Sequence, residues 1–232
     1  MDTSRQDLFL KNKTGFLIDE EGKRSFYNNI NKKQIAIVGC GGIGSPLAQL
    51  LVRGGFKNIL LIDNDMIDKS NLQRQIYDYQ DVGMIKSTSL KFHLEKINPN
   101  VKIELVEDIL TPENIDDVLK NSEFVIDATD DFEVRRLINS YCEKTNKFWQ
   151  YNAAVMSEVM TCVFDGRQKK FNKVFPKKVS NISCCEAGVL ASTTFISASI
   201  AYQELLKFFI ENKYNNLIKF NIWDFKIYNL KI

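Results

Sequence analysis

Four glycines within six residues follow a short apolar run at 35–38. They are Gly39, Gly41, Gly42 and Gly44. A strand that enters a glycine-rich turn and then a helix brings backbone N–H groups close to a phosphate. Glycine suits such a turn because a Cβ would block both the close approach and the backbone angles that it needs. The pattern therefore predicts a nucleotide site, with these glycines against the ligand.

Side chains that suit a triphosphate follow this turn along the chain. Asp63 ends the next apolar run, 59–62, where dinucleotide folds place an acid on the ribose hydroxyls. Further candidates are Asp65, Asn71, Arg74, Gln75, Lys86, Asp130 and Asp131. Ligands bind at the carboxyl ends of strands in open α/β sheets, so we expect these side chains to converge. Arg74 and Lys86 would neutralise phosphate charge, and the carboxylate of Asp130 would hold Mg²⁺.

Alternating strand and helix signals position these candidates. Apolar runs predict strands at 34–39, 58–63, 101–106, 124–127 and 148–154. Helical spacing predicts helices at 43–54, at 84–97, at 131–146, and from Thr111 as the N-cap with Pro112 at the first position. This alternation predicts an α/β fold built on a doubly wound, Rossmann-like, mainly parallel sheet.

The pattern changes after residue 155 and predicts a mixed or antiparallel C-terminal extension. A strand at 158–164 should lead through a turn at 168–171 to another strand, followed by an exposed loop at 172–186. A long helix at 188–210 and short strands near 217–223 and 225–230 follow. We therefore expect an N-terminal arm at 1–33 with a helix at 20–29, an ATP-binding core at 34–155, and an extension at 156–232 within the same globular unit.

The composition excludes several classes of function. The 232 residues carry a net charge of only +2, which gives no overall attraction to nucleic acid or acidic membranes. No apolar run approaches the roughly 20 residues that span a bilayer, and the first residues lack the apolar core of a secretion signal. We expect a cytoplasmic protein without a nucleic-acid or membrane partner.

The cysteines favour neither a disulfide framework nor a zinc site. The five are irregularly spaced and form no Cys-x-x-Cys pair, and His93 is the only histidine. They are Cys40, Cys142, Cys162, Cys184 and Cys185. We expect no zinc, and we expect His93 on a helix surface without a role.

Several motifs together resemble the ThiF/MoeB/HesA family, the bacterial relatives of ubiquitin-activating enzymes. They are Gly-x-Gly-Gly-x-Gly, Asp-x-Asp, Ser-Asn-Leu-x-Arg-Gln, Val-Gly-x-x-Lys and Asp-x-Thr-Asp. The Ser-Asn-Leu-x-Arg-Gln element is specific, because ordinary dehydrogenases do not carry it. The resemblance covers 34–155 closely and resumes at 184–190, where the chain is similar to the family's Cys-x-x-Ala-Gly-Val segment.

This resemblance implies adenylation of the C-terminal glycine of a ubiquitin-like sulfur carrier with ATP. Gly42 would lie against ATP, Asp63 would hold the ribose, and Asn71 and Arg74 would contact the phosphates. Lys86 would stabilise the transition state and Asp130 would hold Mg²⁺. Ser4-Arg5-Gln6 is similar to the family's N-terminal Arg-Gln, which implies that Arg5 serves the partner subunit's phosphates in a homodimer.

The carrier and pathway stay open at this point. Cys184 favours the ThiF-like branch, which serves thiamine thiazole synthesis and uses a cysteine here in sulfur transfer; a sulfur donor protein would then be a further partner. Cys185 beside it is an alternative thiol. The runner-up is MoeB-like activation of the molybdopterin synthase small subunit, followed by peptide adenylation in antibiotic synthesis.

Two further classes of protein also remain. An NAD-dependent oxidoreductase would share the glycines and Asp63, but it would not need Arg74, Lys86 or Asp130. A non-catalytic scaffold would keep the fold and pair with an active subunit. Simpler roles exist for single residues, since Asp130 could cap the helix at 131–146 and Asp127 could brace the turn from strand to helix.

Overall fold

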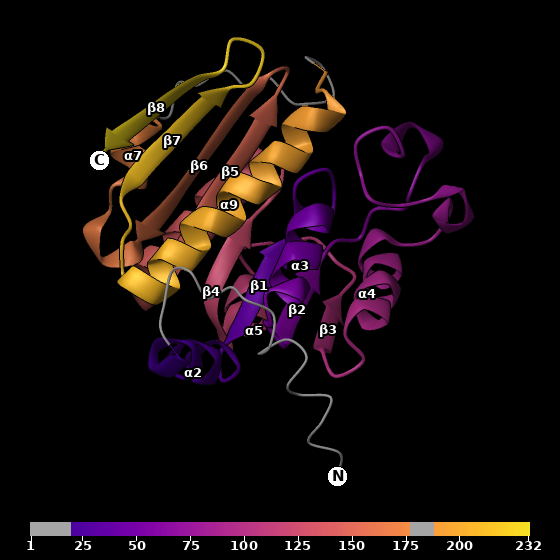
Figure 1. Cartoon of the computed structure of the whole chain (residues 1–232), viewed down its shortest axis with the longest axis horizontal. Helices are drawn as coiled ribbons and strands as arrows, with labels where there is room; N and C mark the ends of the chain where they lie inside the picture. The colour runs from indigo at the N-terminus through magenta and orange to yellow at the C-terminus, as the bar shows by residue number, and fades with distance from the viewer. Residues whose placement is uncertain (1–19, 177–187) are drawn as a thin grey trace.

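The computed structural model describes residues 20–176 and 188–232. Within these residues eight strands form a single sheet in the order β3-β2-β1-β4-β5-β6-β7-β8 (Figure 1). The strands are β1 (Gln34–Val38), β2 (Asn58–Ile62), β3 (Lys102–Val106), β4 (Ser122–Asp127), β5 (Phe148–Val155), β6 (Glu158–Asp165), β7 (Asn216–Asn221) and β8 (Lys226–Lys231). The first five run parallel, and the last three continue the sheet antiparallel. The expected α/β fold with an antiparallel extension is confirmed.

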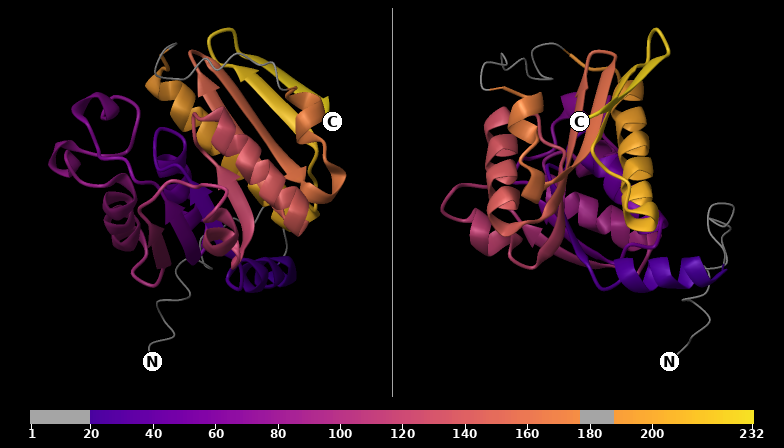
Figure 2. Two further views of the ribbon diagram at one scale, coloured as in Figure 1. Left: turned by 180° about the vertical axis from the view of Figure 1, so that it is seen from behind. Right: turned by 90° about the vertical axis from the view of Figure 1, so that its left-hand side faces the viewer.

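Helices cover both faces of this sheet (Figure 2). They are α2 (Glu20–Ile30), α3 (Gly44–Arg53), α4 (Lys86–Ile97), α5 (Ile115–Leu119), α6 (Phe132–Thr145), α7 (Phe171–Val174) and α9 (Ala191–Glu211). One core lies between the sheet and α2, α3, α4 and α9, and the other lies between the sheet and α5, α6 and α7. No helix in the described ranges is both long and apolar enough to span a membrane.

The apolar runs become strands because both of their faces are covered. Ile35 and Ile37 of β1 point into the first core, while Ala36 and Val38 point into the second. All four are buried, as the side chains of a parallel strand between two helical layers must be. A continuous apolar run, rather than an alternating one, is therefore the pattern that this sheet requires.

The connections of β1 create the crevice in which the candidate residues meet. β1 pairs with β2 on one side and with β4 on the other. The chain passes from β1 through α3 to β2 across one face, and it returns to β4 through α5 on the opposite face. Open α/β sheets bind ligands at such a reversal, beyond the carboxyl ends of the strands.

The predicted start of helix α5 is wrong by three residues. α5 begins at Ile115, with Asn114 in the N-cap position. Thr111 instead begins a turn, in which its hydroxyl accepts from the N–H of Glu113 and its own N–H donates to the side chain of Asn114. Pro112 lies within this turn. Thr111 has the side chain of an N-cap, but it satisfies a turn that precedes the helix.

The strand predicted after the turn at 168–171 is also wrong. Lys169 adopts a left-handed conformation with φ 50°, and the helix α7 begins at Phe171. The ring of Phe171 is buried, with centroids 5.0 Å from Trp149 and 5.5 Å from Phe164. Burial of this ring against the sheet favours a helical turn that packs on β5 and β6. Part of the loop expected at 172–186 is therefore helical, and 177–187 lie outside the described residues.

The long C-terminal helix begins later than expected. α9 starts at Ala191, because Gly188 has φ 74° and Val189 forms an isolated bridge with Met156. The helix then crosses the face of the sheet over β5 and β6 (Figure 1). Its first turn thereby reaches the glycine-rich turn after β1, as described below.

Candidate functional site

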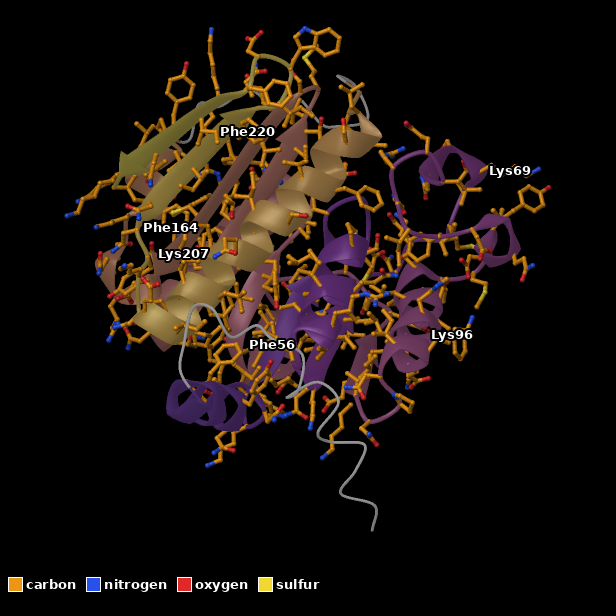
Figure 3. All side chains as sticks on the ribbon, viewed as in Figure 1. Phe56, Lys69, Lys96, Phe164, Lys207 and Phe220 are labelled. Carbon is orange, nitrogen blue, oxygen red and sulfur yellow. The ribbon has the colours of Figure 1, made fainter. Side chains whose placement is uncertain are left out.

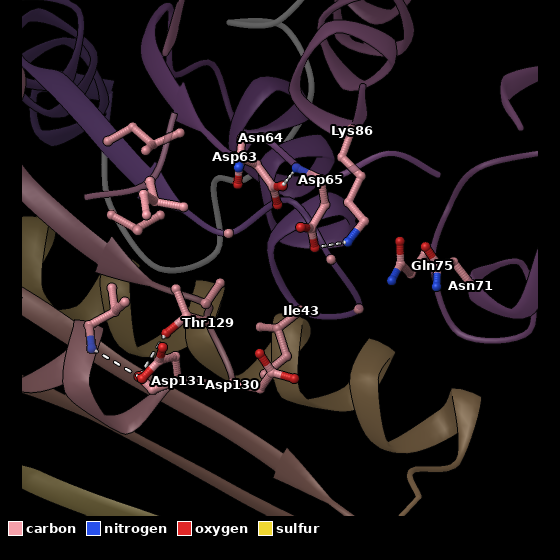
Figure 4. Close-up of a pocket in the computed structure, with 18 of the residues that line it drawn as sticks. Ile43, Asp63, Asn64, Asp65, Asn71, Gln75, Lys86, Thr129, Asp130 and Asp131 are labelled. Carbon is pink, nitrogen blue, oxygen red and sulfur yellow. Dashed lines mark hydrogen bonds and ion pairs between the residues drawn. The ribbon is translucent and has the colours of Figure 1, made fainter. Parts of the chain in front are cut away.

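A cavity of about 440 Å³ lies at the carboxyl ends of β1, β2 and β4. Eleven of the predicted site residues line it, from five separate stretches of the chain. Figure 4 labels seven of them. They are Gly39, Gly41, Gly42, Asp63, Asp65, Asn71, Arg74, Gln75, Lys86, Asp130 and Asp131. Arg5 and Cys184 lie outside the described residues.

The glycine-rich turn is shaped by close backbone approaches. Gly39 has φ 90°, and a Cβ on it would lie 2.8 Å from the carbonyl oxygen of Ala128. A Cβ on Gly42 would lie 2.9 Å from Cγ2 of Thr194, a residue of α9. Gly44 does not line the cavity; a Cβ there would lie 1.8 Å from the carbonyl oxygen of Gly39. Gly44 thus closes the turn, which is a packing role rather than a ligand contact.

Asp63 braces this turn from the end of β2. Its carboxylate accepts from the N–H of Cys40 at 2.6 Å and from the N–H of Asp65 at 2.8 Å. Burial raises the pKa of this carboxyl, and the two hydrogen bonds oppose that effect only in part. A carboxylate has about four acceptor positions, so Asp63 can hold the turn and still accept from a ligand's hydroxyl groups.

Lys86 brings a nearly buried cation to the cavity. Its Nζ lies 2.7 Å from Oδ2 of Asp65, and its backbone N–H donates to the Asp65 carbonyl at 2.8 Å. The side chain of Lys86 is 10% exposed, whereas that of Asp65 is 67% exposed. The ammonium is thus fixed by its surroundings, and its acidic partner lies on the open side.

The polar loop between β2 and α4 supplies the remaining polar groups. Arg74 donates to the carbonyl of Ser70 at 2.9 Å. Its own carbonyl lies 3.0 Å from the hydroxyl of Thr194, which shares its single proton with the Ala191 carbonyl at 2.9 Å. Gln75 is buried, and within the described residues its Oε1 has no hydrogen-bond partner. Lys69 is no cavity cation, since it lies at the outer edge of the loop, over the ring of Tyr79 (Figure 3).

Three aspartates at the end of β4 and just after it have three different surroundings. Asp127 is buried, accepts from the N–H and hydroxyl of Thr129, and pairs with Arg135 at 3.1 Å. Burial raises its pKa, and Arg135 partly offsets this rise. Asp131 caps α6 by accepting from two backbone N–H groups. Asp130 is exposed and lines the cavity. Asp131 rather than Asp130 therefore caps α6, and Asp127 braces the turn from strand to helix.

Two residues that line the cavity were not predicted from the sequence. Arg135 is buried, lines the cavity, donates to the carbonyls of Thr129 and Asn152, and packs on the ring of Tyr151. In the sequence it is one of two adjacent arginines on a helix, with no local sign of burial. Thr194 reaches the site from α9, and no short-range pattern signals that contact.

His93 lies on α4, as predicted, but it is less exposed than a surface position would be and it has polar contacts. It is half-buried, and its Nε2 lies 2.9 Å from Oδ2 of Asp81. Asp81 also accepts from the hydroxyl of Ser89 and from the N–H of Asp78. This cluster ties α4 to the polar loop, so His93 helps to hold the segment that carries Arg74 and Lys86.

The donor set suits a phosphate-bound magnesium ion better than a metal held by protein alone. Among residues 20–176 and 188–232, no group of three or more His, Cys, Asp or Glu side chains is placed to hold a metal ion. Mg²⁺ is commonly bound by one or two carboxylates together with substrate phosphates. Asp130 at the cavity supplies one such carboxylate.

Comparison with known proteins gives a consistent set of relatives. The model of the ThiF family matches residues 15–232. A probable molybdopterin-synthase adenylyltransferase of Porphyra purpurea is 32% identical over 190 residues, covering 79% of this chain and 50% of that protein. The molybdopterin-synthase adenylyltransferase of Haemophilus influenzae is 32% identical over 184 residues, covering 77% and 75%. The chain spans about half the length of the first of these relatives.

Solved structures share the fold at lower sequence identity. Escherichia coli MccB with MccA-N7isoASN has a TM-score of 0.78 at 20% identity, covering 90% of this chain and 66% of that one. The structure of PaaA has a TM-score of 0.77 at 21% identity, covering 90% and 67%. At these identities the likeness establishes the architecture alone.

Proposed function

The chain belongs to the ThiF family, and on that premise we propose that it is an adenylyltransferase that activates the C-terminal glycine carboxylate of a ubiquitin-like sulfur carrier with ATP. One observation carries the proposal above all. A glycine-rich turn, two basic side chains and an exposed carboxylate from separate segments surround one cavity at the carboxyl ends of β1, β2 and β4. The names of the curated relatives support the same reaction.

The cavity fits ATP in size and in polar groups. Its volume of about 440 Å³ lies within the range of small-molecule sites. Gly41 lines the cavity with no atom closer than 3.6 Å to where its Cβ would lie, and the buried Oε1 of Gln75 offers an acceptor to a ligand. Asp63 would hold the ribose, and Asp130 would hold Mg²⁺ together with the phosphates.

The reaction requires positioning and charge neutralisation rather than a general base. The C-terminal carboxylate of the carrier is ionised at neutral pH and attacks the α-phosphorus of ATP. The new bond makes a carrier–AMP anhydride, and the broken bond releases pyrophosphate. Asn71 and Arg74 would contact the phosphates, and Lys86 would stabilise charge on the transferring group. A bound Mg²⁺ would neutralise further charge on the phosphate oxygens.

Two carriers are candidates on different grounds. Cys184 favours a ThiS-like carrier of thiamine thiazole synthesis, with Cys184 or Cys185 taking part in sulfur transfer from a donor protein. The similarity to the Haemophilus influenzae enzyme favours the small subunit of molybdopterin synthase equally well. We also propose a homodimer in which Arg5 serves the site of the second copy. We further propose that the protein binds no zinc.

The test is exchange of pyrophosphate into ATP, with each candidate carrier added in turn. We expect exchange that depends on one carrier and disappears when its terminal glycine is deleted. The rate with each carrier decides between the two pathways. ATP binding without exchange on any carrier would contradict the carrier proposal, and binding of a nicotinamide cofactor in place of ATP would support the oxidoreductase alternative.

A further inference from the structure

Tyr77 joins the glycine-rich turn to the start of α4. Its side chain is 4% exposed and does not line the cavity. The hydroxyl lies 2.7 Å from the carbonyl oxygen of Cys40 and 3.1 Å from that of Lys86. A hydroxyl has one proton to donate, so the two carbonyls share it, and the shorter contact is to Cys40. Tyr77 therefore connects two segments that carry proposed ATP contacts.

Both polar backbone groups of Cys40 are anchored. Its N–H donates to the carboxylate of Asp63 at 2.6 Å, and its carbonyl accepts from Tyr77. A trans peptide is planar, so the N–H of the next residue, Gly41, points opposite to the Cys40 carbonyl. That N–H consequently points away from Tyr77, on a residue that lines the cavity. Within the described residues it donates no hydrogen bond.

Sterics alone do not hold this peptide in place. A Cβ on Gly41 would meet nothing closer than Nε2 of Gln75 at 3.6 Å, so no neighbour crowds the position. Glycine also tolerates the backbone angles that a rotation of the Cys40–Gly41 peptide would produce. A rotated peptide would turn the negative end of the carbonyl dipole toward a phosphate. Hydrogen bonds do hold the peptide: Tyr77 binds the Cys40 carbonyl, and Ser45 donates to the Gly41 carbonyl from its N–H and its hydroxyl.

We propose that Tyr77 is a positioning residue for ATP, whose hydroxyl holds the Cys40–Gly41 peptide so that the Gly41 N–H donates to the phosphates. The inference rests on the proposed function, because it assigns the phosphates to the side of the turn that faces the cavity. The phenol stays protonated, since burial, with Cys40 and Asp63 adding to it, raises the pKa of Tyr77. The Tyr77 hydroxyl can therefore donate to the Cys40 carbonyl at every working pH.

The variant Tyr77→Phe removes the hydroxyl and keeps the ring. Binding of ATP and of adenosine is measured separately by calorimetry, because adenosine lacks the phosphates that the Gly41 N–H would contact. We expect the Kd for ATP to rise about tenfold and the Kd for adenosine to stay unchanged. The matched control is Tyr79→Phe in the same loop, where the ring is 68% exposed; it should change neither Kd.

Two results would overturn the inference. An equal weakening of ATP and adenosine would show a merely structural role, and an unchanged Kd for ATP would show no role. A second measurement needs no variant, because the amide resonance of Gly41 in the ¹⁵N-labelled protein should shift when inorganic triphosphate is added. A Gly41 resonance that does not move, in a protein that binds ATP, also contradicts the inference. Lack of ATP binding by the unmodified protein would contradict the proposed function itself.

Discussion

The ammonium of Lys86 and the carboxylate of Asp65 form an ion pair of 2.7 Å in the wall of the cavity (Figure 4). The two partners differ in solvent exposure, because the lysine side chain is nearly buried and the aspartate side chain is mostly exposed. A phosphate that enters the cavity can therefore replace Asp65 as the partner of a cation that is already in place. The free protein keeps Lys86 neutralised and pre-positioned.

Removal of this cation should slow turnover strongly. We expect Lys86→Ala to lower the rate of carrier-dependent pyrophosphate exchange by about 100-fold or more, as loss of one group that stabilises transition-state charge does elsewhere. Initial rates at saturating ATP provide the measurement. Lys91→Ala is the matched control, since Lys91 lies on the same helix and pairs with Glu95 at the surface. A Lys86→Ala enzyme as fast as this control would remove Lys86 from the mechanism.

Substitutions of the two neighbouring aspartates at the start of α6 should have different effects, one on stability and the other on activity. Asp131 caps the helix, so Asp131→Ala should lower the free energy of unfolding by about 1 kcal/mol. Asp130→Ala should leave the unfolding midpoint nearly unchanged and greatly reduce exchange, because Asp130 would hold Mg²⁺. Urea unfolding and exchange rates are measured on both variants. The reverse pattern, with Asp130 needed for stability alone, would contradict the assignment.

The contact from α9 to Arg74 should influence phosphate binding. Thr194→Val keeps the side-chain shape and removes the hydroxyl that the carbonyls of Arg74 and Ala191 share. We expect the KM for ATP to rise by about threefold to tenfold, in line with the loss of one hydrogen bond. Ser199→Ala on the same helix, where the hydroxyl bonds only within the helix, is the control. Equal KM values for the two variants would show that this contact does not position Arg74.

Acid pH should weaken the link between the polar loop and α4. Burial alone would raise the pKa of Asp81, but hydrogen bonds from Asp78, Ser89 and His93 outweigh it and lower the pKa. A carboxylate with a lowered folded-state pKa stabilises the protein above the unfolded value of about 3.9. That contribution disappears as the pH falls through the folded-state pKa.

The variant Asp81→Asn tests this dependence. It should lower the free energy of unfolding at pH 7 by about 1–3 kcal/mol, because it disturbs a buried hydrogen-bonded carboxylate. The difference from the unmodified protein should shrink as the pH is lowered below about 4. Chemical unfolding at a series of pH values measures it. A difference that is constant over the whole series would contradict the role of the ionised carboxylate.

The parts of the fold that could be predicted depend on local patterns. The buried runs at β1, β2 and β4 are apolar on both faces, and the glycines after β1 must precede a helix. The acids and cations follow strands whose carboxyl ends meet at one edge of a parallel sheet. Eleven candidate residues therefore reach one cavity, although their roles toward ATP remain predictions.

The remaining features depend on contacts that are distant in sequence. Phe171 begins a helix because its ring packs on β5 and β6, and Thr194 contacts a carbonyl that lies 120 residues earlier. Arg135 is buried because Asp127 ends the neighbouring strand. The role of Gly44 in closing its turn depends on the position of the Gly39 carbonyl. A single sequence contains no short-range signal for such pairings.

The proposed adenylation is tested most directly by following the α-phosphate of ATP. The protein is incubated with a candidate carrier, Mg²⁺ and ATP that carries a radiolabel in either the α- or the γ-phosphate. If the protein adenylates the carrier, the label from the α-phosphate appears on the carrier, and this requires the carrier's terminal glycine carboxylate. Label from the γ-phosphate on the carrier, or no label from either position with every carrier, would contradict the proposed adenylation.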